Sequence, residues 1–386
     1  MDSDRIVTIL STLVAFDTTS RNSNLAIIDW IEAYLTPRGF RCERVPDETG
    51  TKANLMASIG PDDVPGYVLS GHTDVVPVDD QTWTSDPFVL RREGGRLYGR
   101  GACDMKGFLA VCLAAADDMA ARPLAEPVHL AFSYDEEVGC VGAKRLVARL
   151  AGRAVTPKAC FVGEPSGMGV VIGHKGKRSV RARVRGLTCH SSLAPHGVNA
   201  VQYGALLAAE IHRVAEELSR SGPRDGLYDV PFSTGHVGIL RGGTALNIVP
   251  DSCELAFEFR AVGADDPDAL VARVVEHART RLEPLMQAVD PATGIDFEVY
   301  AGFPGLDTAP DDPVVTLAKT LAARNDHSKV AYGTEAGLFS QVAGIPSVII
   351  GPGSIEQAHK ADEWIEIAQL EACGRFVDRL IERARA

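Results

Sequence analysis

Apolar side chains recur along the outer parts of the chain at two spacings, one typical of helices and one typical of buried strands. A spacing of three or four residues, as in Ile6, Leu10 and Leu13, predicts a helix with one buried face. Helices of this kind are expected at residues 4–16, 24–36, 106–121, 335–342 and 366–383. Short apolar runs that predict buried strands lie at residues 54–59, 67–70, 128–134, 160–162, 329–332 and 347–351. Strands that alternate with helices in this way predict an α/β fold with a mixed, mostly parallel sheet and helices on both faces.

The middle of the chain has a different pattern. Polar and apolar residues alternate at 178–185 and 253–260, and amphipathic helices are predicted at 199–219 and 266–282. This pattern predicts a small α+β sandwich inserted into the α/β domain. The expected boundaries are residues 1–177 and 303–386 for the outer domain and residues 178–302 for the insertion.

Length and charge narrow the class of protein. A chain of 386 residues exceeds the usual size of a single core, which also favours two domains. The net charge of -12 argues against nucleic acid as the main partner, and no apolar stretch reaches the roughly eighteen residues of a membrane span. The start of the sequence has no secretory pattern, and the eight cysteines form no CxxC pair, so reduced thiols and a cytoplasmic location are expected.

His72 ends the apolar run that begins at residue 67. Asp74 lies two residues later, so its side chain projects to the same side of an extended chain. A carboxylate there could accept the second imidazole N–H, as often happens beside a metal-bound histidine. The alternative is a histidine that ends a strand with its hydrogen bonds satisfied.

Asp104 lies in a glycine-rich stretch, residues 99–107, just before the helix predicted from Lys106. Glycines allow the backbone to approach an ion closely. A carboxylate has two oxygens and can bridge two cations roughly 3.5–4 Å apart. The alternative role for Asp104 is that of a helix N-cap.

Three consecutive acids, Asp135, Glu136 and Glu137, follow the apolar run at 128–134. Like charges destabilise one another unless a cation or solvent screens them. One acid of such a group can bind a metal ion while its neighbour acts as a general base towards water. A solvated loop is the alternative.

Two more ionisable residues follow apolar runs. Glu164 comes after the run at 160–162, and His359 lies in the segment after 347–351. Histidine and carboxylate ligands without cysteine suit zinc, cobalt or manganese in a hydrolytic site. The chain has no H-E-x-x-H, no G-x-S-x-G and no complete dinucleotide glycine motif, which argues against serine hydrolases and nicotinamide enzymes.

In this order the motifs resemble those of the M20 family of dinuclear zinc amidohydrolases, and the resemblance covers nearly the whole chain. It implies a zinc aminopeptidase-like catalytic domain and an inserted dimerisation (lid) domain. It also implies that His72 and Glu164 hold one metal ion, that Glu137 and His359 hold the other, and that Asp104 bridges them.

The resemblance further assigns catalytic groups. Glu136 is expected to be the general base, Asp74 is expected to orient His72, and a cis peptide bond is expected after Asp104. His190 matches a lid histidine that polarises the substrate carbonyl, often from the other subunit, so a homodimer through the insertion is expected. Without the resemblance, a histidine among small polar residues indicates a surface turn.

The resemblance also supplies substrate-binding positions: Asn247, Arg260, Gly333, Thr334 and Glu335. A guanidinium suits a substrate carboxylate because the two groups pair through parallel hydrogen bonds. The alternatives are an ion pair on a strand face for Arg260 and a helix N-terminal acid for Glu335.

The implied activity is metal-dependent hydrolysis of the N-acyl amide of an amino acid. Two divalent ions are expected, with Zn²⁺ as the first choice and Co²⁺ as the alternative. The most similar branch of the family converts N2-acetyl-L-ornithine to L-ornithine and acetate in arginine biosynthesis. N-succinyl-diaminopimelate, another N-acyl amino acid or a dipeptide remain alternative substrates, and a catalytically silent metal- or ligand-binding protein is the alternative from a different class.

Overall fold

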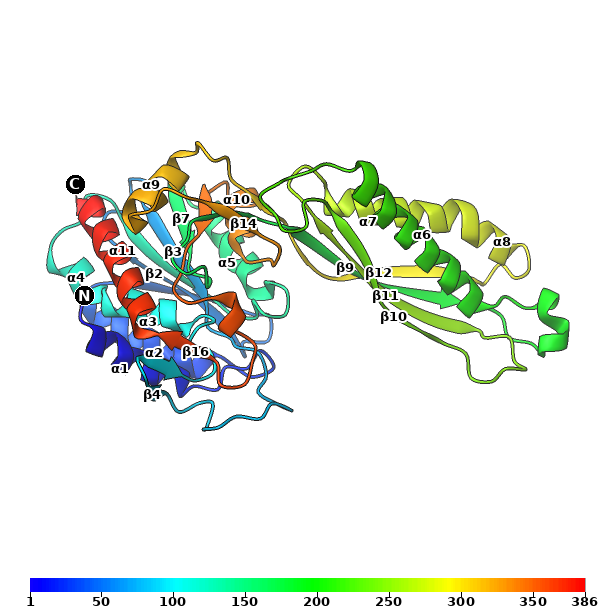
Figure 1. The fold of residues 1–386 in the computed structure, drawn as a ribbon, viewed down its shortest axis with the longest axis horizontal. Coiled ribbons are helices and arrows are strands. Elements are labelled where there is room, and N and C mark those ends of the chain that lie inside the picture. The colour runs from blue at the N-terminus through cyan, green and yellow to red at the C-terminus, as the bar shows by residue number, and fades with distance from the viewer. Residues whose placement is uncertain (386) are drawn as a thin grey trace. The chain divides into compact units, whose positions relative to one another are not determined.

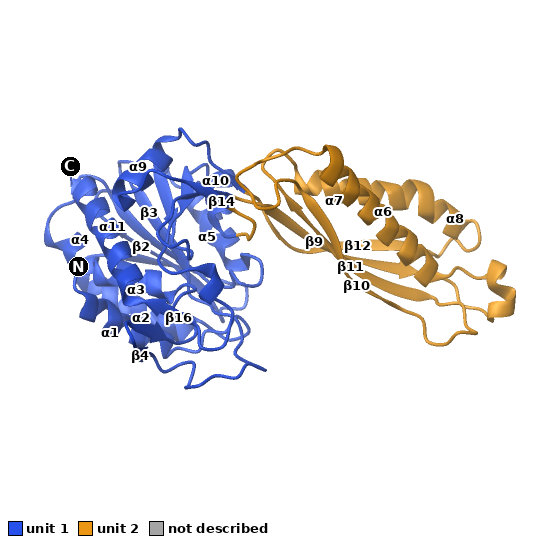
Figure 2. Cartoon of the chain, viewed as in Figure 1, with its two compact units in different colours: residues 1–173, 306–329, 334–386 blue, residues 174–305, 330–333 orange. Residues whose placement is uncertain are grey.

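The computed structural model describes residues 1–385, which form two compact units (Figures 1 and 2). Unit 1 comprises residues 1–173, 306–329 and the chain from Thr334 onwards. Unit 2 comprises residues 174–305 and 330–333. Unit 1 is therefore assembled from segments that precede and follow the main segment of unit 2 in the sequence.

Unit 1 contains a nine-stranded sheet in the order β1-β2-β6-β3-β7-β15-β8-β13, with β14 paired to β8. The strands are β1 (Arg41–Pro46), β2 (Ala53–Ile59), β3 (Tyr67–His72), β6 (Val128–Ser133), β7 (Ala159–Val162), β8 (Val171–His174), β13 (Leu306–Asp307), β14 (Ser328–Val330) and β15 (Ser347–Ile349). The central pairs β6–β3, β3–β7 and β7–β15 are parallel. The pairs β1–β2, β2–β6 and β15–β8 are antiparallel. Strands β3, β6, β7 and β15 are buried along their whole length, as expected for strands covered on both faces.

Helices cover both faces of this sheet (Figure 1). The helices of unit 1 are α1 (Ser3–Val14), α2 (Leu25–Leu35), α3 (Lys106–Ala114), α4 (Ala116–Ala121), α5 (Val141–Ala151), α9 (Pro313–Ala322), α10 (Ala336–Gln341) and α11 (Ile367–Arg385). One apolar core joins α1, α2, α3, α9 and α11 to strand side chains such as Leu69, Leu130 and Phe161. Helices α5 and α10 contact each other away from that core, beside β6 and β7.

A second, three-stranded sheet of unit 1 brings two distant loops together. Its order is β16-β5-β4, with β4 (Arg91–Glu93), β5 (Arg96–Tyr98) and β16 (Trp364–Glu366). Strands β5 and β16 are antiparallel, with Trp364 opposite Tyr98. This pairing places the segment after residue 98 next to the segment before residue 364.

Unit 2 is a four-stranded sheet in the order β10-β11-β9-β12, with antiparallel neighbours and helices on one face (Figure 2). Its elements are β9 (Gly176–Arg185), α6 (Ala200–Ser221), β10 (Thr234–Gly242), β11 (Ser252–Ala261), α7 (Pro267–His277), a π-helical turn (Ala278–Leu282), α8 (Glu283–Gln287) and β12 (Gly294–Phe303). Helix α6 starts where the Asn199 side chain accepts the Gln202 N–H at 3.0 Å. Its residues Leu207, Ile211 and Val214 are buried against the sheet.

The predicted fold class is confirmed: a mixed α/β sheet whose central strands are parallel. The helix predicted at 106–121 is interrupted at Ala115 and forms α3 and α4. No helix within residues 1–385 is long and apolar enough to cross a membrane.

Candidate metal centre

The candidate ligands lie where the parallel strands of unit 1 end. His72 is the last residue of β3, Glu136 and Glu137 follow β6, Glu164 follows β7, and His359 lies in the loop after β15. Parallel neighbours point their carboxyl ends to the same edge of a sheet, which is where α/β folds place their ligand sites. The sheet order therefore gathers side chains that are far apart in the sequence.

Asp104 lies between the two histidines. Its Oδ1 is 3.1 Å from His72 Nε2 and its Oδ2 is 3.3 Å from His359 Nε2. The turn before it requires Gly101, because φ is +79° there and a Cβ would come within 2.7 Å of the Val75 side chain. One carboxylate thus faces two imidazoles with different oxygens, which is the arrangement that a bridging ligand needs. The peptide bond after Asp104 is cis, as the resemblance implies.

Glu164 and Glu137 complete two groups around Asp104. Glu164 Oε1 is 3.7 Å from His72 Nε2, and Glu137 Oε2 is 3.1 Å from His359 Nε2. Donor atoms of His72, Asp104 and Glu137 lie within 4.8 Å of one another, as do those of His72, Glu136 and Glu164. These distances are short enough for common ligation of small divalent cations.

Close backbone contact holds the ends of β7 and β15 together. A Cβ at Gly351 would lie 2.0 Å from the carbonyl oxygen of Gly163, so only glycine fits. The N–H of Ser166 donates to the carbonyl of Gly351 at 3.2 Å. The loop that carries His359 therefore starts beside Glu164.

The charges of the cluster favour the binding of a cation. Burial and neighbouring carboxylates raise the pKa of Glu136 to about 8 and that of Glu137 to about 7, and they raise the pKa of Glu164 well above its usual value. Hydrogen bonds with Asp104 and Glu137 raise the pKa of His359 to about 10. Glu137 Oε1 is buried without a hydrogen-bond partner. An orphaned carboxylate oxygen among surplus negative charge fits a site for divalent metal ions.

Asp74 supports this cluster differently from the sequence prediction. The Nδ1–H of His72 donates to the main-chain carbonyl of Asp74 at 2.8 Å, whereas the carboxylate is 3.6 Å away. The carboxylate instead accepts the main-chain N–H groups of Glu136 and Glu137, at 3.1 and 3.3 Å, and the Ser20 hydroxyl at 2.7 Å. Asp74 thus fixes the His72 tautomer through its backbone and the acidic loop through its side chain.

Glu136 has one side-chain contact that the sequence did not suggest. The Cys140 thiol donates to its Oε1 at 3.2 Å, and Cys140 is fully buried. No short motif reveals this contact, because it depends on the turn after β6, where Cys140 has a positive φ of 57°.

Three of the candidate residues, His190, Asn247 and Arg260, lie in the main segment of unit 2, residues 174–305. The exposed His190 pairs with Ile248 in an isolated β-bridge, and its Nδ1 is 2.8 Å from the Ser192 hydroxyl. Asn247 is also exposed. It lies near His190, because its main-chain carbonyl accepts the N–H of the next residue, Ser191, at 3.0 Å. Arg260 lies on β11 and donates from Nε to Glu258 Oε1 at 2.8 Å, the ion pair that the sequence left as an alternative.

The predicted substrate-binding turn at Gly333–Glu335 is packed rather than open. A Cβ at Gly333 would lie 1.9 Å from the Phe303 ring. Thr334 is fully buried and its hydroxyl accepts the Ala336 N–H at 3.0 Å, as at a helix start. Glu335 is also fully buried, and its two oxygens accept the hydroxyls of Ser70 and Ser133, each at 2.6 Å. The side chains of Thr334 and Glu335 therefore each have a hydrogen-bond partner in the interior, whereas Gly333 is partly buried.

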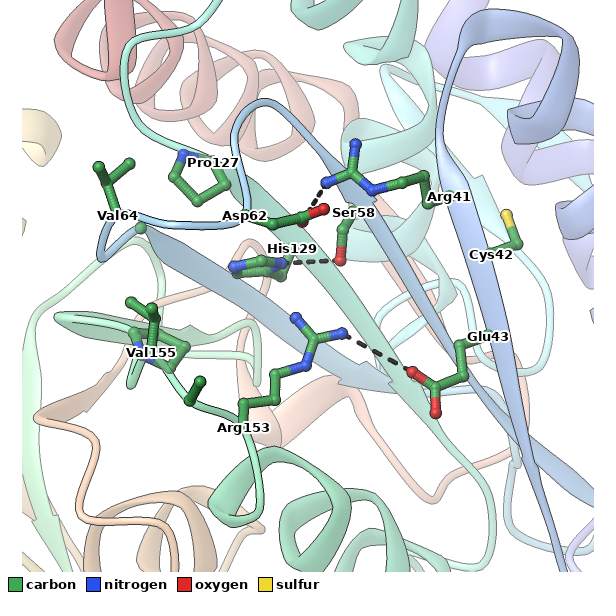
Figure 3. A pocket seen from close by; sticks show the side chains of 13 residues that line it. Arg41, Cys42, Glu43, Ser58, Asp62, Val64, Pro127, His129, Arg153 and Val155 are labelled. Carbon is green, nitrogen blue, oxygen red and sulfur yellow. Dashed lines mark hydrogen bonds and ion pairs between the residues drawn. The ribbon is translucent and has the colours of Figure 1, made fainter.

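The structure also has a cavity of about 340 Å³ at the opposite ends of β3, β6 and β7 (Figure 3). His129 lies in it with Nδ1 2.8 Å from the Ser58 hydroxyl. Arg41 pairs there with Asp62, and Arg153 faces Glu43 at 3.8 Å. Its charges are balanced among themselves, in contrast to those of the metal cluster.

Comparison with known proteins identifies the family. The sequence pattern of Peptidase family M20/M25/M40 matches residues 68–383. The chain belongs to this family. It is 34% identical over 377 residues to an acetylornithine deacetylase of Myxococcus xanthus, covering 96% of this chain and 95% of that relative. It is 33% identical over 373 residues to an acetylornithine deacetylase of Yersinia pseudotuberculosis, covering 95% of this chain and 93% of the relative.

Solved structures of the family share the fold. The aminopeptidase PepT of Bacillus cereus superposes with a TM-score of 0.76 at 24% identity, with all of both chains covered. An M20 family metallo-carboxypeptidase of Sulfolobus solfataricus gives a TM-score of 0.75 at 19% identity, again over all of both chains. The protein is thus an M20 hydrolase that acts on amide bonds, in a family whose metal sites are dinuclear.

Proposed function

We propose that this M20 hydrolase removes the acyl group from an N-acyl amino acid, with N2-acetyl-L-ornithine as its substrate. The observation that carries the proposal is Asp104, whose two oxygens face His72 and His359 at 3.1 and 3.3 Å. Glu164 and Glu137 add one carboxylate to each side. The choice of substrate is supported by curated relatives, which are named acetylornithine deacetylases at 33–34% identity.

In this proposal His72 and Glu164 would hold one metal ion, Glu137 and His359 would hold the other, and Asp104 would be shared between them. Zn²⁺ is the proposed ion and Co²⁺ the alternative, because imidazole and carboxylate ligands suit both. When bound, the ions supply Lewis acidity that lowers the pKa of water and polarises the acyl carbonyl.

Glu136 is the proposed general base. It takes a proton from the attacking water and later delivers it to the leaving amine nitrogen. One of its carboxylate oxygens lies within 4.8 Å of donor atoms of His72 and Glu164, so the group is next to the ligands that would hold a metal ion. The Asp74 carboxylate holds the main chain of Glu136 in place at 3.1 Å.

Unit 2 supplies the proposed substrate contacts. His190 donates a hydrogen bond to the developing oxyanion, and its Nδ1 contact with Ser192 leaves Nε2 for this purpose. Asn247 and Arg260 bind the substrate carboxylate. We propose a supporting role for Thr334 and Glu335 instead of substrate contact, because both are fully buried.

A homodimer through unit 2, with His190 serving its own or the partner's site, is part of the proposal. The motivation is that His190, Asn247 and Arg260 all belong to unit 2, whereas the candidate metal ligands belong to unit 1. Sedimentation of the active protein tests this, and a fully active monomer would contradict a shared site.

The decisive experiment is a substrate panel. Purified protein with added Zn²⁺ or Co²⁺ is assayed for amine release from N-acetylornithine, other N-acetyl amino acids, N-succinyl-diaminopimelate and dipeptides. The largest kcat/KM is expected for N-acetylornithine. A larger value for a succinylated substrate or a dipeptide would move the protein to another branch, and metal binding without turnover of any amide would identify a silent binding protein.

A further inference from the structure

Glu363 is a fully buried carboxylate with a complete set of donors around it. Its Oε1 accepts the main-chain N–H groups of Cys103 and Asp104, at 2.9 and 3.0 Å. Its Oε2 accepts the N–H of Gly101 at 3.0 Å and the Arg100 guanidinium at 2.8 Å. Only 1% of Glu363 is exposed. Each oxygen therefore accepts two hydrogen bonds, and the carboxylate fixes the backbone on which Asp104 is mounted.

Glu363 also belongs to the loop that carries His359, four residues earlier in the chain. The main-chain N–H of Gly99 donates to the Glu363 carbonyl at 2.9 Å, next to the β5–β16 pairing. The side chain and backbone of one residue thus join the Asp104 loop to the His359 loop. These two loops supply the atoms that face each other at 3.3 Å, Asp104 Oδ2 and His359 Nε2.

Arg100 and Gln81 extend this connection to the backbone of His359. The fully buried Arg100 guanidinium donates to Glu363 and to the side-chain oxygen of Gln81. The amide nitrogen of Gln81 donates to the carbonyl of His359 at 3.1 Å. His359 itself is half exposed, so few other contacts hold its position. We call Glu363, Arg100 and Gln81 the Glu363 clamp.

We propose that the Glu363 clamp positions the metal ligands: it holds Asp104 and His359 at the separation that the second metal ion requires. The inference rests on the proposed dinuclear site and assigns a role to residues that contact neither substrate nor metal. The side that depends most on the clamp is that of His359 and Glu137, because His359 is held through the clamp. His72 is on the opposite side and is fixed by β3 and by the Asp74 carbonyl.

The physical reason for a carboxylate at position 363 is its double acceptor capacity. Glutamine has a single carboxamide oxygen and can keep only one of the two pairs of hydrogen bonds. Its NH₂ group would face either the N–H groups of Cys103 and Asp104 or those of Gly101 and Arg100. The substitution Glu363→Gln therefore leaves the volume unchanged but releases one side of the clamp.

The test measures metal affinity as well as turnover. Metal-free wild type, Glu363→Gln and Gln81→Ala are titrated with Zn²⁺ by calorimetry with a competing chelator. Wild type is expected to bind two ions, and Glu363→Gln is expected to lose about 10- to 100-fold in affinity for the weaker one, the range found when groups behind metal ligands are removed. The stronger site is expected to change much less, and saturating Zn²⁺ is expected to restore most of kcat.

Glu283→Gln is the matched control. Glu283 is a buried carboxylate of unit 2 that accepts the Ile295 N–H at 2.8 Å and pairs with Arg279. The substitution Glu283→Gln also removes a carboxylate oxygen that accepts a hydrogen bond in the interior. Because Glu283 lies outside unit 1, the Zn²⁺ affinity of this variant is expected to stay at the wild-type value.

The outcomes separate this inference from the proposed function. A wild type that binds fewer than two ions refutes the dinuclear site and the clamp together. If wild type binds two ions and Glu363→Gln folds but keeps both Zn²⁺ affinities, the clamp alone is refuted. An equal loss of Zn²⁺ affinity in Glu283→Gln also refutes the clamp. If Glu363→Gln does not fold, Gln81→Ala decides, because Gln81 is only partly buried: about tenfold weaker binding of the second ion supports the clamp, and no change refutes it.

Discussion

Metal binding is expected to release protons, because both candidate imidazoles hold one in the metal-free protein. The pKa of His359 is raised to about 10 by its hydrogen bonds with Asp104 and Glu137. Burial opposes a charge on His72, but the hydrogen bond with Asp104 and the nearby Glu164 raise its pKa well above the usual value. A nitrogen that binds a metal ion must be deprotonated, so each ion displaces one of these protons.

The magnitude follows from one imidazole per ion. Near neutral pH the imidazole alone accounts for about one proton per ion, so each apparent affinity rises at least about tenfold per pH unit, or ~1.4 kcal/mol. Between about pH 6 and pH 8 each affinity should rise about 100-fold, which corresponds to ~2.7 kcal/mol. Glu164 and Glu137, whose pKa values are also raised, add to the proton release at the His72 and His359 sides respectively, so these figures are lower bounds.

Calorimetry in two buffers with different ionisation enthalpies measures the proton number directly. Two protons or more are expected per pair of Zn²⁺ ions, and His359→Asn is expected to release about one fewer, since asparagine carries no ionisable proton. Binding of both ions without proton release, or with an affinity that is independent of pH, would show that the imidazoles are not the ligands.

Three further results are expected. Glu136→Gln should bind two metal ions like wild type, yet lose about 10²- to 10⁴-fold in kcat, or ~3–5 kcal/mol, measured with N-acetylornithine; substantial residual turnover would remove Glu136 from the role of base. Asp74→Asn should lower kcat about 10- to 100-fold, because one of its two oxygens that hold the Glu136–Glu137 backbone is replaced by a donor; wild-type kcat would refute the positioning argument. Burial and the Arg153 charge lower the pKa of His129 from 6.5 to about 4, so the folded protein binds fewer protons there than the unfolded chain. The resulting contribution to the free energy of unfolding, up to ~3 kcal/mol, is complete above about pH 6.5 and is lost as the pH falls towards 4. Urea unfolding of wild type and His129→Gln across this pH range measures it. Equal acid sensitivity in both proteins would contradict the assignment.

The sequence predicted most of the strands whose burial is complete, although it missed β8, which is also buried throughout. Strands β3, β6 and β7 are continuous apolar runs because both of their faces are covered, and the ligands follow from the ends of these runs. Strand β1 was not predicted, because its residues alternate between exposed and partly buried at the sheet edge and form no apolar run. Helix α5 was also missed, although Leu146, Val147 and Leu150 carry helical spacing.

Buried polar groups were the part of the site that the sequence could not reveal. The interior position of Glu335 depends on hydroxyls of Ser70 and Ser133, which are 265 and 202 residues away in the chain. Glu363 likewise depends on amides about 260 residues away. A short motif shows which residue types are present, but the partners that make such burial favourable exist only once the strands are paired.

The order of strands in unit 1 has a consequence for the synthesis of the chain. Strand β15 lies between β7 and β8, so the sheet has a gap until residue 349 has left the ribosome. Unit 2 is formed mainly by one continuous segment, residues 174–305, and its sheet can form earlier. His359 follows Glu164 by 195 residues, so the last candidate ligand emerges roughly 10–40 s after the others at ordinary elongation rates. The nascent chain can therefore complete the sheet of unit 2 while the edges of β7 and β8 that face β15 are still unpaired, and the complete metal centre can form only at the end of translation.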